Sequence, residues 1–374
     1  MKYRFYTIVL LLLFIFLSAC SRRIKYRGEF IDNRSISYGN SKQVNTGYTN
    51  KKVDIPLEYQ WEGRFPAVVV SGLIGSSKFI AAGDYKGNLF LLNSINGKKI
   101  AKKRFKGGFS APPVIVDTML VYATDTKKQH IGVINLRNGK IIWKRRGNNF
   151  ETQFAVHRNV VYIGDDEGII YAWNLLDGRR IWRNDIGGAV SAGCAIVDTI
   201  LITATRDQKI IGLDYTNGQI LWETDLHSAA MGKITIVDAF VYCSDFGGNI
   251  YKIRIDNGRI LDQYGTSESI RSGISYMDGV IYACSNDGIL YAITDSNFTL
   301  LFKYKTDGPL ITSALVSEEK VLFGSLNGHL YVLNRTNGKK MFEYDAGSPI
   351  ISEPVNTGNY IVFCCRNRKI YAFQ

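Results

Sequence analysis

The sequence predicts an all-β protein, an eight-bladed β-propeller made of four-stranded antiparallel blades. The main observation is that landmark residues recur at a step of about 40 residues, which is the length of one propeller blade. The 374 residues also include 36 Gly, 22 Tyr and 19 Phe but 7 Pro, as is typical of many short strands joined by tight turns. The two landmark series are Tyr171, Ile211, Tyr251, Tyr291, Tyr331 and Tyr371, and Gly97, Gly139, Gly178, Gly218, Gly258 and Gly338.

Residues 186–224 illustrate one repeat. Small residues at its start are followed by apolar segments at 194–197, 200–204 and 209–214 and by a last segment around Trp222. Polar turns separate these segments, so each repeat predicts four antiparallel strands. The middle strands are continuously apolar, which indicates that neighbouring sheets cover both faces of each sheet.

A recurring motif marks the end of each repeat. It consists of Asn or Asp, three residues, Gly, three residues and Trp, as in Asn174, Gly178 and Trp182. The amide or carboxylate can cap the turn, and the glycine can adopt a left-handed conformation. We expect the Trp to cover the seam towards the next blade.

The number of outer strands predicts the number of blades. Eight positions correspond to the Trp of the motif, namely Trp61, Ala101, Trp143, Trp182, Trp222, Asp262, Phe302 and Phe342. The chain ends after the third strand of its last repeat, whereas residues 58–64 form a single fourth strand ahead of the first complete repeat. We therefore expect residues 58–64 to complete the blade begun by residues 350–374 and to close the ring. The propeller would span residues 57–374.

The N-terminus has the pattern of a signal peptide. Lys2 and Arg4 precede an apolar run over residues 5–17, which is shorter than the roughly 20 residues that a membrane span needs. Residues 1–19 are thus a predicted signal peptide, and a short permanent anchor helix is the alternative.

Leu17-Ser18-Ala19-Cys20 resembles the bacterial lipobox. This resemblance implies that Cys20 becomes the lipidated first residue and, with Ser21 in place of Asp, that the protein lies on the periplasmic face of the outer membrane. Residues 20–56 would form a flexible, basic tether attracted to anionic lipids. A solvated linker without that attraction is equally compatible with the composition.

The sequence of the repeats resembles the quinoprotein-type, or PQQ-like, propeller repeat. The matching residues are Ser110-Ala111-Pro112 with Val114, then Val161-Tyr162 with Gly164, and then residues 168–174. A repeated Gly-His and Trp-Asp pattern, which the WD40 alternative would require, is missing from the sequence. Together with the lipobox, the repeats resemble the lipoproteins of the outer-membrane β-barrel assembly machinery. The resemblance implies a non-enzymatic scaffold without a cofactor that binds the periplasmic domains of the barrel-insertion subunit.

The resemblance also implies a partner contact at the loop that enters the third blade. In this chain the loop contains Arg145, Arg146, Asn148, Asn149 and Phe150. It is basic but has a single large apolar side chain. An ordinary solvated loop is the alternative interpretation.

The sequence offers little evidence of catalysis. Cys364 and Cys365 are adjacent, but their place in a second strand predicts buried free thiols. The same is expected of Cys243 and Cys284 in the corresponding strands and of Cys194 in a first strand. The four His residues lie in different repeats, and the acidic cluster of residues 165–167 lies at a turn, where a polar turn is favoured over a calcium site.

The net charge of +13 is dispersed over turns and outer strands, which argues against nucleic-acid binding and for an anionic membrane or an acidic partner. We expect a monomeric propeller. A ligand-binding protein or quinoprotein-like enzyme that uses the central channel is the alternative.

Overall fold

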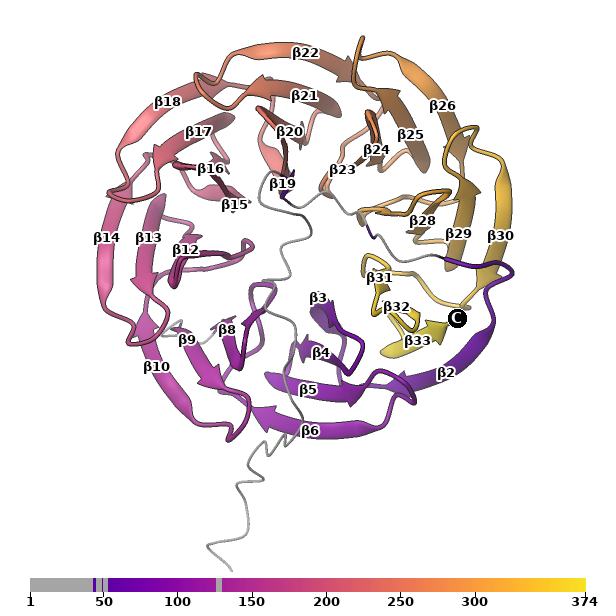
Figure 1. Cartoon of the computed structure of the whole chain (residues 1–374), viewed down its shortest axis with the longest axis horizontal. Helices are drawn as coiled ribbons and strands as arrows, with labels where there is room; N and C mark the ends of the chain where they lie inside the picture. The colour runs from indigo at the N-terminus through magenta and orange to yellow at the C-terminus, as the bar shows by residue number, and fades with distance from the viewer. Residues whose placement is uncertain (1–42, 45–48, 50–52, 126–129) are drawn as a thin grey trace, which may run out of the picture.

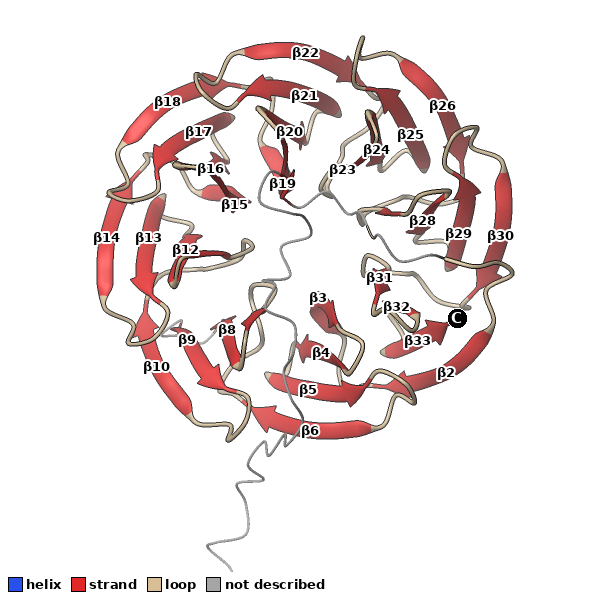
Figure 2. Cartoon of the chain, in the orientation of Figure 1, coloured by secondary structure: helices blue, strands red, loops and turns tan. Residues whose placement is uncertain are grey.

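The structure is a computed structural model that describes residues 43–44, 49, 53–125 and 130–374. The predicted signal peptide, Cys20 and most of the predicted tether lie outside the described residues. The described part of the chain contains strands and loops and no helix (Figure 2). None of its segments is therefore a helix able to cross a membrane.

The sheets are arranged around a common centre, with the first strand of each repeat innermost (Figure 1). Four of the four-stranded sheets are each formed by four consecutive strands, in the order expected for antiparallel meanders. Their strands are β3 (Val69–Gly75), β4 (Phe79–Asp84), β5 (Asn88–Asn93) and β6 (Lys99–Arg104); β7 (Val114–Val116), β8 (Met119–Thr124), β9 (His130–Asn135) and β10 (Ile141–Arg146); β11 (Ala155–His157), β12 (Val160–Gly164), β13 (Ile169–Asn174) and β14 (Arg180–Asp185); and β23 (Ser275–Met277), β24 (Val280–Cys284), β25 (Ile289–Thr294) and β26 (Leu300–Lys305).

Two consecutive repeats share one nine-stranded sheet. A parallel bridge between Ala192 and Gly232 joins their innermost strands, β15 and β19. The strands of the two repeats are β15 (Val190–Val197), β16 (Ile200–Thr205), β17 (Lys209–Asp214) and β18 (Ile220–Asp225), and β19 (Ala230–Val237), β20 (Phe240–Asp245), β21 (Asn249–Arg254) and β22 (Ile260–Gly265). The ninth strand, β1 (Gln43–Val44), pairs with β19.

The remaining strands include the last strand of the chain and the strand that begins at Tyr59. One sheet consists of β27 (Leu315–Val316), β28 (Lys320–Gly324), β29 (His329–Asn334) and β30 (Lys340–Asp345), and another of β31 (Val355–Asn356), β32 (Ile361–Cys364), β33 (Lys369–Phe373) and β2 (Tyr59–Arg64). The N-terminal strand β2 pairs antiparallel with the C-terminal strand β33. The backbone N–H groups of Glu58 and Gln374 each donate a hydrogen bond to the carbonyl of the other, at 2.8 and 2.9 Å.

The described end of the predicted tether is packed on the propeller. β1 lies antiparallel to the last residues of β19, and the N–H of Thr49 donates to the carbonyl of Val316 at 2.8 Å. Val53 and Leu57 are buried in an apolar cluster with residues of β28–β33. The burial of these apolar side chains orders the chain segment immediately before β2.

The apolar core is divided between neighbouring sheets. One cluster joins Val121 and Val133 of one sheet to Val161 and Tyr171 of the next, and similar clusters lie along the other seams. Each sheet thus buries both faces, as its continuously apolar middle strands predict.

The Trp motif closes these seams in the predicted way. The indole Nε1 of Trp182 donates to the carbonyl of Tyr215 in the next repeat at 2.9 Å. Trp143 and Trp222 make the equivalent bonds at 2.7 and 2.8 Å. The indole of Trp182 lies on Gly218, which has φ +77°, and a Cβ added there would lie 2.6 Å from the ring. Glycine is therefore required for two reasons, its left-handed backbone and the indole against it.

We predict that Gly218→Ala destabilises the protein more than Gly187→Ala. Both glycines have positive φ, but a Cβ on Gly187 would meet nothing within 4 Å. Backbone strain costs roughly 1–2 kcal/mol in either variant, and overpacking against the indole adds about 1–3 kcal/mol in Gly218→Ala alone. The measurement is the free energy of unfolding from urea denaturation. Equal losses in the two variants would contradict the role of the indole contact.

Candidate functional site

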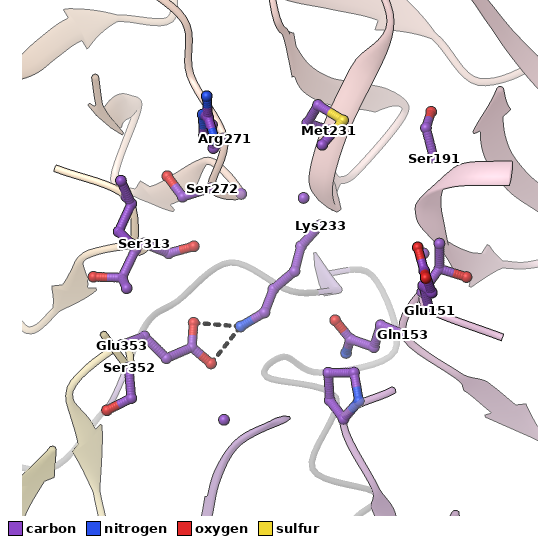
Figure 3. Close-up of a pocket in the computed structure, with 18 of the residues that line it drawn as sticks. Glu151, Gln153, Ser191, Met231, Lys233, Arg271, Ser272, Ser313, Ser352 and Glu353 are labelled. Atoms are coloured by element: carbon purple, nitrogen blue, oxygen red, sulfur yellow. Dashed lines mark hydrogen bonds and ion pairs between the residues drawn. The ribbon is translucent and has the colours of Figure 1, made fainter. Parts of the chain in front are cut away.

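A cavity of about 470 Å³ lies at the centre of the propeller. It is lined by residues of the innermost strands β3, β7, β15 and β19, by the segments before β11, β23, β27 and β31, and by Arg206 after β16. Figure 3 labels ten of the lining residues. A step of 40 residues relates eight lining positions, which are Leu73, Pro113, Gln153, Gly193, Lys233, Gly273, Ser313 and Glu353. The repeat thus brings one equivalent position from each repeat to the channel, and two of these positions are glycines.

An ion pair crosses the cavity. The Nζ of Lys233, on β19, donates to both carboxylate oxygens of Glu353, which lies 120 residues further along the chain (Figure 3). The two side chains are 23% and 21% exposed, so solvent reaches the pair from the cavity. The pair links two repeats that are not neighbours in the chain.

Glycines in the adjacent repeats make room for the long side chains of the channel. A Cβ on Gly273 would lie 2.7 Å from the Cβ of Lys233, and a Cβ on Gly193 would lie 2.7 Å from the Cβ of Gln153. Both distances are shorter than van der Waals contact. In successive repeats, the equivalent channel positions therefore alternate between a long side chain and a glycine around this part of the channel.

Further charges line the mouth of the cavity. Arg206 forms an ion pair with Glu151 at 3.3 Å, but both side chains are at least half exposed, so this pair contributes little to stability. The guanidinium of Arg271 lies 5.0 Å from the ring centre of Phe246. Within the described residues, no carboxylate lies within ion-pair distance of Arg271.

The predicted contact loop leads directly into this cavity. Arg145 and Arg146 are exposed at the end of β10, and Glu151 and Gln153, which follow the loop, line the cavity. The Nε of Arg145 donates to the carbonyl of Gly178 in the next repeat at 2.8 Å. Arg145 therefore also fastens β10 to the neighbouring sheet.

The asparagines of the loop hold it in place. The backbone N–H of Asn149 donates to the carboxylate of Asp166 at 3.1 Å, and its side chain donates to Glu151. The side chain of Asn148 donates to Asp165 at 3.4 Å. Both asparagines are half-buried.

The structure corrects the prediction for Phe150. Its side chain is fully buried and packs edge-on against Tyr171 and Trp173 at 5.8 and 6.1 Å between ring centres. It anchors the loop to the core, because an aromatic side chain gains more from burial between sheets than from solvent exposure. The contact surface therefore lacks the apolar side chain that the sequence suggested.

The acidic cluster forms a turn, as the sequence favoured. Asp165 is buried and accepts hydrogen bonds from the backbone N–H groups of Glu167 and Ile169 and from the hydroxyl of Tyr171. These bonds use the carboxylate to cap the turn. Over the ranges that the structure describes, no group of three or more His, Cys, Asp or Glu could hold a metal ion.

The cysteines after residue 20 are buried free thiols, which confirms the prediction for Cys194, Cys243, Cys284, Cys364 and Cys365. Burial raises the pKa of Cys194 and Cys284 from 9.0 to about 12. Such thiols are poor nucleophiles at neutral pH.

The sequence motifs did not predict the Lys233–Glu353 ion pair. Neither residue belongs to a motif, and the partners are far apart in sequence. The available signal was the 40-residue step, which aligns Lys233 with Glu353 when it is extended to the first strand of each repeat. The cavity residues are therefore an addition to the predicted site.

Comparisons with known proteins place these features in a family. The fold and the repeats define a β-propeller with PQQ-like repeats. The chain belongs to the family described as "Outer membrane protein assembly factor BamB", whose model matches residues 64–184 and 166–294. No curated protein matches the sequence.

Solved structures share the fold at low sequence identity. BamB from Moraxella catarrhalis has a TM-score of 0.72 and 14% identity, covering 85% of this chain and 99% of that one. The computationally designed Ika8 protein has a TM-score of 0.75 and 16% identity, covering 84% and 99%. The quinohemoprotein alcohol dehydrogenase from Comamonas testosteroni has a TM-score of 0.74 and 11% identity, covering 91% and 80%. At these identities the likeness shows the fold alone.

We predict that none of the five cysteines after residue 20 reacts with a thiol reagent at pH 8 in the native protein, because all five thiols are buried. The chain has six cysteines, so the unfolded protein should show five reactive thiols if Cys20 is lipidated and six if it is not. Because burial raises the pKa of Cys194, this thiol stabilises the fold below pH 9 and loses that contribution as the pH rises towards about 12. Rapid labelling of a native thiol would contradict the burial.

We also predict energetic coupling across the channel. Lys233→Met and Glu353→Gln should each reduce the free energy of unfolding by about 1–2 kcal/mol, since each leaves one partly buried charge without its partner. The double variant should lose less than the sum, with a coupling of about 1 kcal/mol. Urea denaturation of the four proteins measures this cycle. Strict additivity would mean that the pair does not connect the two sheets energetically.

Proposed function

We propose that this protein is a non-enzymatic, outer-membrane-anchored scaffold that takes part in the assembly and insertion of outer-membrane β-barrel proteins from the periplasmic side. The observation that carries this proposal is the family match over residues 64–184 and 166–294. A quinoprotein-like enzyme is the alternative, and its support is a likeness of fold at 11% identity. Likeness of fold alone does not define an activity.

The proposed layout has an anchor, a tether and an eight-bladed ring. Residues 1–19 would be a cleaved signal peptide, Cys20 would carry the lipid, and residues 20–56 would lead to the propeller of residues 57–374. The eight blades are supported by the number of four-strand runs when the nine-stranded sheet is counted as two. Closure of the ring is supported by the pairing of β2 with β33.

The proposed partner surface is the end of β10 with the loop after it, namely Arg145 and Arg146 on the strand and Asn148 and Asn149 in the loop. Its two arginines give it positive charge, and the partner would be the periplasmic part of a barrel-insertion subunit with complementary acidic groups. The burial of Phe150 and the bond from Asn149 to Asp166 fix the loop before binding. A surface that is already ordered loses less conformational entropy on association.

We predict that Arg146→Glu weakens recovery of the partner. An affinity-tagged full-length chain would be purified from detergent-solubilised membranes, and the amount of co-purified barrel-insertion subunit would be measured. Charge reversal at the rim of an interface should lower recovery several-fold, and the loss should shrink at high salt.

Arg259→Glu provides the matched control. Arg259 is an exposed arginine directly before the outer strand β22, three repeats further along the chain. This variant should leave recovery unchanged. An equal loss in both variants would show that net charge, rather than the loop, governs binding, and absence of the subunit from the unmodified chain would overturn the assembly role.

A further inference from the structure

We propose that the mouth of the channel is a binding site for a carboxylate carried on an apolar body, with Lys233 as its primary cation and Arg271 as a second. This site goes beyond the scaffold role, because it assigns a ligand chemistry to the cavity. It does not depend on the lipid anchor or on the identity of the partner.

The structure already contains a carboxylate in the proposed position. Glu353 places both of its oxygens on the Nζ of Lys233 across the cavity (Figure 3). The geometry of this pair shows that the channel can hold a carboxylate against Lys233. Glu353 therefore serves as an internal competitor that an incoming carboxylate would displace.

The exchange is feasible because both partners face the cavity. Each side chain of the pair is about one-fifth exposed, so a displaced Glu353 can turn towards solvent without becoming an isolated buried charge. The glycine at position 273 leaves the Lys233 side chain unobstructed on the side of the neighbouring repeat. The pair can thus open at lower cost than a fully buried one.

A second cation gives the ligand an advantage over Glu353. Arg271 lines the same cavity, comes from the repeat after that of Lys233, and stacks on the exposed ring of Phe246. In the described part of the chain it has no acidic partner within ion-pair distance. Its charge is therefore available to an anion that enters the mouth.

The remaining lining defines the body of the ligand. Polar side chains, among them Ser191, Ser272 and Ser352, share the cavity wall with apolar ones. The apolar ones are Leu73, Pro113, Val114, Met231, Ile311 and Ile351. A cavity of about 470 Å³ lies in the size range of small-molecule sites. An apolar or aromatic group attached to the carboxylate would remove this surface from water.

The carboxylate can come from a free small molecule or from a protein segment. The second source is favoured by continuity, because Glu151 and Gln153 of the cavity directly follow the loop of residues 145–150. A partner on that loop could place an acidic side chain or a C-terminus in the mouth. The two sources share one chemistry and differ in the test below.

Two pairs of probes test the proposal on the full-length chain in detergent. Phenylacetate and its neutral analogue phenylacetamide represent the free source. The acetylated tripeptide Ala-Ala-Leu, with a free or an amidated C-terminus, represents the protein source. Binding is measured by calorimetric titration at low ionic strength. We expect at least one charged probe to bind and its neutral analogue to bind about tenfold more weakly or not at all, as one lost charge contact of about 1.4 kcal/mol implies.

Variants separate the site from general effects. Glu353→Gln removes the competitor and should tighten binding about tenfold, whereas Lys233→Met should abolish it. Both variants break the same ion pair, so a loss of folding cannot explain opposite changes in affinity. Lys340→Met, which breaks a Lys–Glu pair on the outer strand β30, should leave affinity unchanged. No binding of either charged probe to the Glu353→Gln variant, or equal binding to the Lys233→Met variant, would overturn the proposal.

Discussion

The contact of an indole with a glycine in the next sheet is the constraint on which the rest of the structure depends. A four-stranded sheet that is apolar on both faces is not stable alone, and it must be covered on both sides. At the outer edge, the sheets are covered by the indoles of Trp143, Trp182 and Trp222. Each indole donates its N–H to a carbonyl of the following repeat. The bond sets the distance between sheets, and the glycine sets how closely the indole can approach.

The outer seams and the apolar clusters hold neighbouring sheets together, and the Lys233–Glu353 pair adds a link across the channel. Its eight lining positions vary from glycine and proline to Lys233 and Glu353. A channel position is nevertheless constrained by its neighbour in the adjacent repeat, since a Cβ on Gly193 or Gly273 would lie 2.7 Å from the Cβ of Gln153 or Lys233. Polar and charged side chains gather in the channel, but some also lie between sheets, where the buried Lys252 of β21 pairs with Asp295 of the next repeat at 2.9 Å.

Much of the fold could be predicted from the sequence because the determining interactions repeat. The strand prediction for residues 209–214 coincides with β17, and the seam predicted for Trp182 has its expected partner. Features that occur once were harder to infer. Phe150 was expected at a contact surface but is buried. The local sequence, one aromatic residue after two arginines, looks the same whether that residue is exposed at an interface or buried in the core. The Lys233–Glu353 pair depends on how two distant repeats face each other, which no local pattern contains.

The two proposed sites follow from one segment of chain. The loop of residues 145–150 crosses from the outer strand of one sheet to the channel, where Glu151 and Gln153 face the cavity. The ring of Phe150 fixes this crossing in the core. A rigid crossing places exposed arginines and the channel mouth in a constant relation, so a partner bound to one is positioned with respect to the other. The burial of Phe150 thus removes an apolar contact from the surface but gives the segment the rigidity that a shared binding face requires.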